Sequence, residues 1–169
     1  MKLRSRKGFT LVELLVVVAV LGVLIMLGMP NYLGAERKAR LAQVKGNMHA
    51  AQICAEAYAT DSGGTYAATA SELDPFYPNG ANTIGGAAGK RPMNPFTVVD
   101  NEPLYGETLT TAALILSTRV APPTAGPGTQ GQTGYSVADA GRSYAVAGVD
   151  EQARRLSGPN NGTLVLSNQ

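Results

Sequence analysis

Cysteine and histidine are almost absent from this sequence, and tryptophan is missing altogether. The 169 residues include one cysteine and one histidine. Cys54 has no second cysteine to pair with, so no disulfide can form within this chain even in an oxidising compartment. Nucleophilic triads and zinc sites both rely on histidine, and His49 stands alone. We therefore expect no catalytic residue, no cofactor and no metal site, and we assign His49 and Cys54 to packing.

Carboxylates offer the remaining route to site chemistry. Asp139, Asp150 and Glu151 fall in turns of the predicted sheet, where a carboxylate pair or a calcium site could be built. Their spacing does not follow that of an EF-hand loop. We interpret these three residues as solvated turn residues.

Basic charge is also scarce outside the first few residues. Four of the fourteen Lys and Arg residues lie among residues 1–7, which leaves ten basic residues against twelve acidic ones, or −2, in the rest of the chain. The formal charge of +2 therefore belongs to the N-terminal segment, and nucleic acid is an unlikely partner.

A long apolar run follows that basic segment. From Phe9 to Met29 every residue is apolar, Gly or Thr except Glu13. As a helix, these residues reach about 31 Å, the thickness of a bilayer core, so the run predicts a membrane-spanning helix. A carboxylate near the bilayer centre costs about 2.5–3.5 kcal/mol, so Glu13 needs a partner unless it reaches back to water or to the basic residues before it.

The first 30 residues resemble a known targeting signal. A basic leader, then Gly8, then Phe9-Thr10-Leu11-Val12-Glu13 and an apolar helix are similar to the class III signal of type IV pilins and pseudopilins. The resemblance is strong from Gly8 to about Tyr32 and only architectural beyond the helix. Many pilins also carry a C-terminal disulfide loop, which this chain lacks.

The resemblance implies roles for four residues. In that family a prepilin peptidase cuts after the glycine, here Gly8, and methylates the new N-terminus, here Phe9. The residue matching Glu13 pairs with the N-terminal amine of a neighbouring subunit during assembly. Pro30 matches the proline at which many of these helices kink or melt. Because Glu13 lies four residues after Phe9, a pair formed in trans would set the register between subunits.

The rest of the chain predicts a small head on a long helix. We expect an α+β, pilin-like fold in which a long N-terminal helix packs against a small antiparallel sheet. The expected regions are a leader (1–8), a transmembrane helix (9–30), an amphipathic half of the helix (31–61) and a globular head (62–169). The packing face of the amphipathic half is an apolar stripe at helical spacing, made of Leu41, Val44, Met48, Ala51, Ala55 and Tyr58.

Within the head, the pattern predicts short elements separated by Gly- and Pro-rich loops. We expect a short helical turn at 71–78 and an exposed loop at 121–134. We also expect a strand at 109–120, with a helical turn as the alternative, and a meander of strands at 135–138, 143–149 and 163–167.

These features favour a structural protein over an enzyme. The leading hypothesis is a subunit of a type IV pilus or pilus-like filament, with copies of itself, a prepilin peptidase, an inner-membrane assembly platform and, before assembly, the bilayer as partners. The alternative is a pseudopilin of a type II secretion or DNA-uptake machine, and the outside alternative is a membrane-tethered enzyme. The leader favours a single-pass protein of the inner membrane with its head outside the cytoplasm, which becomes an extracellular or periplasmic filament.

Overall fold

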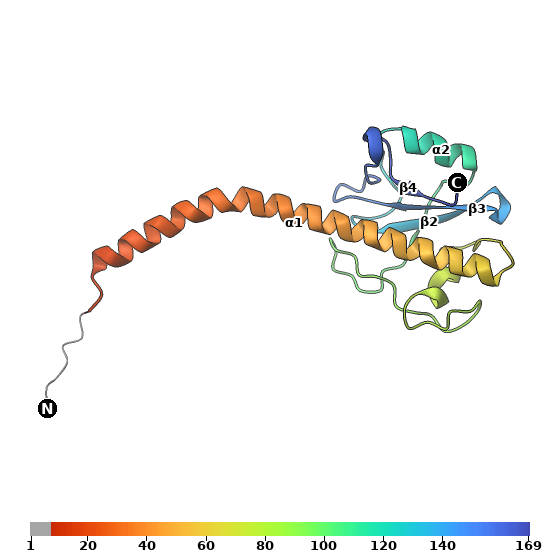
Figure 1. Ribbon diagram of the computed structural model, residues 1–169, viewed down its shortest axis with the longest axis horizontal. Coiled ribbons are helices and arrows are strands. Elements are labelled where there is room, and N and C mark those ends of the chain that lie inside the picture. The colour runs from red at the N-terminus through yellow and green to blue at the C-terminus, as the bar shows by residue number, and fades with distance from the viewer. Residues whose placement is uncertain (1–7) are drawn as a thin grey trace, which may run out of the picture. The chain divides into compact units, whose positions relative to one another are not determined.

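The computed structural model describes residues 8–169 (Figure 1). The predicted leader, residues 1–8, lies outside the described residues except for Gly8. The chain divides into two units, one ending at Ala39 and the other running from Arg40 to Gln169. One helix, α1 (Leu11–Asp61), supplies residues to both units.

The first unit consists mainly of the apolar part of α1. Its large apolar side chains are exposed, from Leu11 (80 % exposed) to Met26 (79 %) and Leu33 (57 %). Among the described residues, α1 is the one helix long and apolar enough to cross a membrane, and none of its most apolar window is buried. Uncovered apolar surface on this scale is unfavourable in water, so this segment requires lipid or other protein around it.

Helix α1 continues through Pro30. Proline has no N–H to donate to the carbonyl of Met26, four residues earlier, so one hydrogen bond of the helix is missing there. That α1 kinks or melts at Pro30 stays a prediction.

The second unit is built around a four-stranded sheet. The strands are β1 (Tyr105–Gly106), β2 (Thr133–Ala138), β3 (Ser143–Gly148) and β4 (Val165–Leu166), in the order β1-β2-β3-β4. The other elements are the 3₁₀ turns η1 (Ala70–Phe76), η2 (Asp139–Gly141) and η3 (Pro159–Asn161), and the helix α2 (Ala112–Val120). The predicted α+β fold, with a long helix packed on a small sheet, is confirmed.

The predicted apolar stripe of α1 packs on one face of this sheet. Val44, Met48, Ala51 and Ala55 are fully buried, and they share a core cluster with side chains that include Tyr135, Tyr144 and Val146 of the sheet. The helix comes very close to β3. A Cβ at Gly148 would lie 2.8 Å from Met48 Sδ and from Val44 Cγ1, so a larger residue at this position would require those side chains to shift.

Helix α2 covers the opposite face of the sheet (Figure 1). Its one buried residue, Ile115, packs with Leu109, Ala138, Ala145 and Val165. The preferred prediction of a strand at 109–120 was therefore wrong, and the helical alternative is the one that the structure shows. Thr111 is the N-cap of a helix, because its side chain accepts a hydrogen bond from the Leu114 amide at 3.2 Å. This helix also buries apolar side chains on the second face of the sheet. Because both faces are covered, every residue of β3 is buried.

The sheet is mixed instead of purely antiparallel. Strands β2, β3 and β4 form the predicted antiparallel meander, with Tyr135 opposite Val146 and Ala147 opposite Val165. Strand β1 joins it in parallel, with Tyr105 opposite Gly134. The short strand β1 was not predicted, because two residues are too few to show an alternating pattern.

A buried ion pair closes the β1 edge of the sheet. Arg155 donates from Nε to Glu107 Oε2 at 3.1 Å and from Nη2 to Oε1 at 2.6 Å, and the two side chains are 9 % and 0 % exposed. The Tyr105 hydroxyl and the Thr108 amide also donate to the carboxylate, at 3.0 and 2.7 Å. Burial by itself would raise the pKa of Glu107, but the hydrogen bonds from Arg155 and Thr108 outweigh it, so the pKa is lowered.

Met48→Asp tests whether the stripe of α1 is the core of the second unit. In a fragment beginning at Asn31, it should lower the free energy of unfolding by about 3–5 kcal/mol, because it places an unpaired carboxylate in an apolar core. The matched control is Ile53→Asp, five residues further along α1, where the side chain is 68 % exposed. Thermal unfolding of both variants measures this. Equal melting temperatures for the two variants would contradict the packing described here.

Acid titration tests the pair of Glu107 with Arg155. Because the pKa of Glu107 is lowered on folding, the pair's contribution is complete above the ordinary value of 4.5 and is lost as the pH falls through the lowered pKa. The free energy of unfolding of the same fragment should therefore fall below about pH 4.5. Glu107→Gln should destabilise it by about 3–5 kcal/mol at pH 7, because Arg155 is left buried without its partner, and should flatten the acid dependence. Asp61→Asn, at an exposed position, should change neither property.

Candidate processing and assembly site

The residues expected to be processed come just before α1. Gly8, Phe9 and Thr10 are outside regular structure and exposed, and α1 begins at Leu11. The Gly8–Phe9 peptide bond is therefore not held in the hydrogen-bonded helix. A peptidase has to bind the backbone of its substrate in its active site, which requires a segment outside a helix. Gly8 has no side chain that would hinder this approach.

Thr10 and Glu13 form a capping box at the first turn of α1. The Thr10 amide donates to Glu13 Oε2 at 2.9 Å, and the Thr10 hydroxyl donates to the same oxygen at 2.7 Å. In return, the Glu13 amide is 3.2 Å from Thr10 Oγ1, which accepts its hydrogen bond. These contacts satisfy backbone amides that a helix start otherwise leaves open, and the negative charge lies where the helix dipole favours it.

The capping box gives Glu13 a local partner before any assembly. The hydrogen bonds that the Glu13 carboxylate accepts within residues 8–169 all go to Oε2, and Oε1 accepts none from the described residues. The box uses the Thr10 amide, which cleavage after Gly8 would leave intact. A new amine at Phe9 would therefore add to the donors at this end of the helix without replacing the cap.

The sequence analysis overlooked this motif, although its signal was present. Thr10-Leu11-Val12-Glu13 has the Thr-x-x-Glu spacing of a capping box directly before an apolar run. Glu13 was interpreted as a charge that needs a partner or reaches back to water and the basic leader, and not as part of a helix cap.

The lone cysteine and histidine belong to the second unit, and their surroundings differ. Cys54 is buried in the core of the second unit, and burial, with a smaller effect from Asp74, raises the pKa of its thiol to about 12. Such a thiol stays protonated and unreactive. His49 is exposed, with Nδ1 3.2 Å from Gln52 Oε1.

Two of the three acidic turn residues, Asp139 and Asp150, accept hydrogen bonds from backbone amides. Asp139 accepts a hydrogen bond from the Ala112 amide at 3.1 Å and so caps α2, while Asp150 accepts from the Gln152 and Arg154 amides of its own turn. Within residues 8–169, no group of three His, Cys, Asp or Glu side chains is placed to hold a metal ion.

Comparison with known proteins assigns the N-terminal segment. Residues 3–29 match the prokaryotic N-terminal methylation motif, which is the class III signal of type IV pilins and pseudopilins. No curated protein and no solved structure matches the chain. The chain thus carries a pilin-type signal on an apolar helix suited to a membrane-anchored precursor, and residues 30–169 lie outside the matched motif.

Two substitutions of Glu13 separate the cap from the charge. Glu13→Gln keeps an oxygen that can accept from the Thr10 amide, whereas Glu13→Val keeps none. Loss of a cap costs about 1 kcal/mol, so amide hydrogen exchange in the first turn of α1 should be roughly fivefold faster in the Val variant and near the wild-type rate in the Gln variant. The measurement uses the full chain in detergent micelles, with Thr10→Ser as a control that keeps the hydroxyl. Identical exchange in all variants would show that the box does not hold the helix start.

Proposed function

We propose that this chain is a structural subunit of a type IV pilus or pilus-like filament. It is made as a membrane-anchored precursor, cut after Gly8, methylated at Phe9 and polymerised through the apolar part of α1. In this proposal its head lies outside the cytoplasm, and its partners are a prepilin peptidase, an assembly platform in the membrane and copies of itself. Its role is structural and not enzymatic.

One observation carries the proposal. The methylation motif covers the first part of α1, where the apolar side chains are exposed and the one charged side chain between Leu11 and Met29 is Glu13. Thr10 already donates to Glu13 Oε2, and Oε1 accepts no hydrogen bond from the described residues. A helix that served only as an anchor would not need that carboxylate. A bundle of such helices would cover the apolar surface after the subunits leave the lipid, and the amine of Phe9 on one subunit could reach Oε1 of Glu13 on the next.

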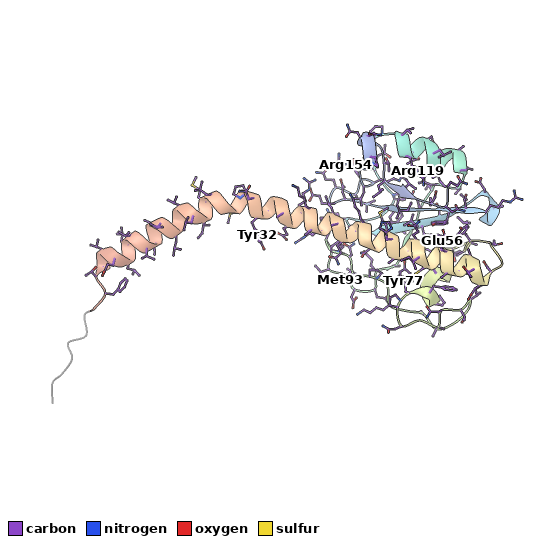
Figure 2. All side chains as sticks on the ribbon, in the orientation of Figure 1. Tyr32, Glu56, Tyr77, Met93, Arg119 and Arg154 are labelled. Carbon is purple, nitrogen blue, oxygen red and sulfur yellow. The ribbon has the colours of Figure 1, made fainter. Side chains whose placement is uncertain are left out.

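The head supports the same proposal by what stabilises it. Cys54 is free, so the head does not depend on a disulfide loop. Polar contacts stabilise it together with its apolar core. Besides the pair of Glu107 with Arg155, Arg119, which is labelled in Figure 2, donates from Nε to the Val165 carbonyl at 3.1 Å and from Nη2 to Ser167 Oγ at 2.8 Å. These contacts tie α2 and the C-terminal segment into one head that α1 can carry.

Filament yield with Glu13→Gln as the sole subunit tests the proposal. The variant keeps the capping box and inserts without the cost of a charge, but it cannot pair with a neighbour's amine, so sheared fibres should fall by about tenfold or more. Intact mass of the membrane-bound protein is the control, and both wild type and variant should begin at Phe9.

Each other outcome has a definite meaning. Normal fibre yield from the variant would refute the role of Glu13 in assembly. A wild-type protein that is cut at Phe9 but never enters surface fibres would favour the pseudopilin of a secretion or DNA-uptake machine. A mature protein that retains residues 1–8 would refute the proposed processing.

A further inference from the structure

An uncharged loop, residues 93–99, lies beside α1 within the second unit. At its start, Asn47 Nδ2 donates to the Met93 carbonyl at 3.0 Å, and Figure 2 labels Met93 beside the helix. Further along the loop, the Arg40 guanidinium lies over the Phe96 ring, 5.8 Å from its centre. Because Asn47 and Arg40 are seven residues apart on α1, the loop runs back along the helix by about 10 Å. It ends beside Arg40, the residue at which the chain enters the second unit.

The hydrogen bonds of Asn94 hold this loop in one shape. Asn94 is buried, its amide donates to the Val99 carbonyl at 3.0 Å, and its carbonyl accepts from the Val98 amide at 2.9 Å. Its side-chain Oδ1 accepts from the amides of Phe96 and Thr97 at 2.9 and 3.3 Å. The loop is therefore closed on itself around a buried polar side chain, and its outer side chains cannot turn inward without breaking these bonds.

The loop presents three apolar side chains to the outside. Met93, Val98 and Val99 are exposed, Val98 by 67 %. Val98 also has a φ of 58°, in the left-handed region that a β-branched residue adopts only under strain. Such strain persists only where the surrounding contacts impose it, and it is concentrated at functional positions. Exposed apolar side chains and a strained backbone in the same loop point to a contact outside this chain.

We propose that loop 93–99 binds the lipid surface beside the point where α1 enters the bilayer, with its three apolar side chains inserted among the lipid headgroups. This inference rests on the membrane anchor in the proposed function and is independent of filament assembly. The chain enters the second unit at Arg40, eight residues after Tyr32, an aromatic residue of the kind that lies at membrane interfaces. Eight helical residues span about 12 Å, so the end of the second unit that holds this loop stays close to the bilayer.

The size and charge of the loop favour lipid over a second protein. A stable protein interface buries about 800 Å² on each partner, and three partly exposed side chains are too few to supply it. Lipid headgroups accept apolar side chains to a depth of about 5–10 Å without a matching shape. Since α1 already holds the chain at the bilayer, a weak contact suffices. The neighbouring charges of Lys90 and Asp100 pair with each other at 2.8 Å, so the contact does not require charged lipid.

A fluorescent label on the loop tests this contact in the full chain. Cys54 is buried and its thiol does not react, so Thr97→Cys and the control Asp61→Cys each take one thiol-reactive label, both at exposed positions. The labelled chains are placed in phosphatidylcholine nanodiscs at one chain per disc, where no second copy can cover the loop. Nitroxides on the lipid headgroups should quench the label at position 97 about twofold or more. The label at position 61, about 31 Å beyond Arg40 along α1, should be quenched much less.

Val98→Asn separates the apolar contact from the shape of the loop. Asn adopts the left-handed conformation readily, so the melting temperature in detergent should stay the same or rise. In nanodiscs, the same substitution should reduce quenching at position 97 to the level seen at position 61, because the most exposed apolar side chain is gone. Quenching that this substitution leaves unchanged would overturn the proposal.

The remaining outcomes are also decisive. An inserted chain whose label at position 97 escapes quenching would overturn this inference alone. A chain that stays outside the discs would overturn the membrane anchor of the proposed function, and this inference with it. A label that is shielded only when several chains share a disc, without quenching by lipid, would assign the loop to a second copy and overturn the lipid contact.

Discussion

The structure depends on one constraint, which is that α1 requires two different environments along a single helix. From Arg40 onwards its apolar stripe packs on the chain's own sheet, and Val44, Met48 and Ala51 are fully buried. Before Ala39 no residue of the described chain covers it, and its apolar side chains are exposed. Hydrophobic surface of that extent has to be removed from water by something outside the chain. The methylation motif at residues 3–29 indicates what that is, because pilin-type precursors begin in a membrane.

The capping box changes how Glu13 is understood. A carboxylate in a membrane-spanning helix needs compensation, and here Thr10 supplies it through its amide and its hydroxyl. The cost of inserting the precursor is thereby reduced before any neighbour is present. The carboxylate of Glu13 has hydrogen-bond donors within its own chain, and its second oxygen could accept a further one. A subunit that stays in the bilayer before it assembles would need both properties.

Sequence reasoning predicted the parts of the fold that depend on local spacing. The stripe of α1 recurs every three or four residues, and Tyr144–Val149 is a short apolar run, so both could be identified directly from the sequence. It failed where distant residues decide the outcome. Residues 109–120 have the composition of a strand, but the structure forms the helix α2 there. The reason lies in distant residues, because Ile115 of α2 packs on the second face of the sheet. Arg155 and Glu107 are 48 residues apart, and no spacing rule brings them together. The signal at Gly8 and Phe9 is contiguous, which is why it could be identified, whereas the Thr10–Glu13 box was local and was simply overlooked.

Electron cryomicroscopy of the assembled fibre tests the central claim, that copies of α1 cover one another in place of lipid. The account predicts a fibre with the apolar part of α1 in its interior, each chain beginning at Phe9 and its amine within hydrogen-bonding distance of Glu13 Oε1 of a neighbouring chain. A fibre in which the apolar part of α1 faces solvent, or in which Glu13 contacts only its own Thr10, would contradict it.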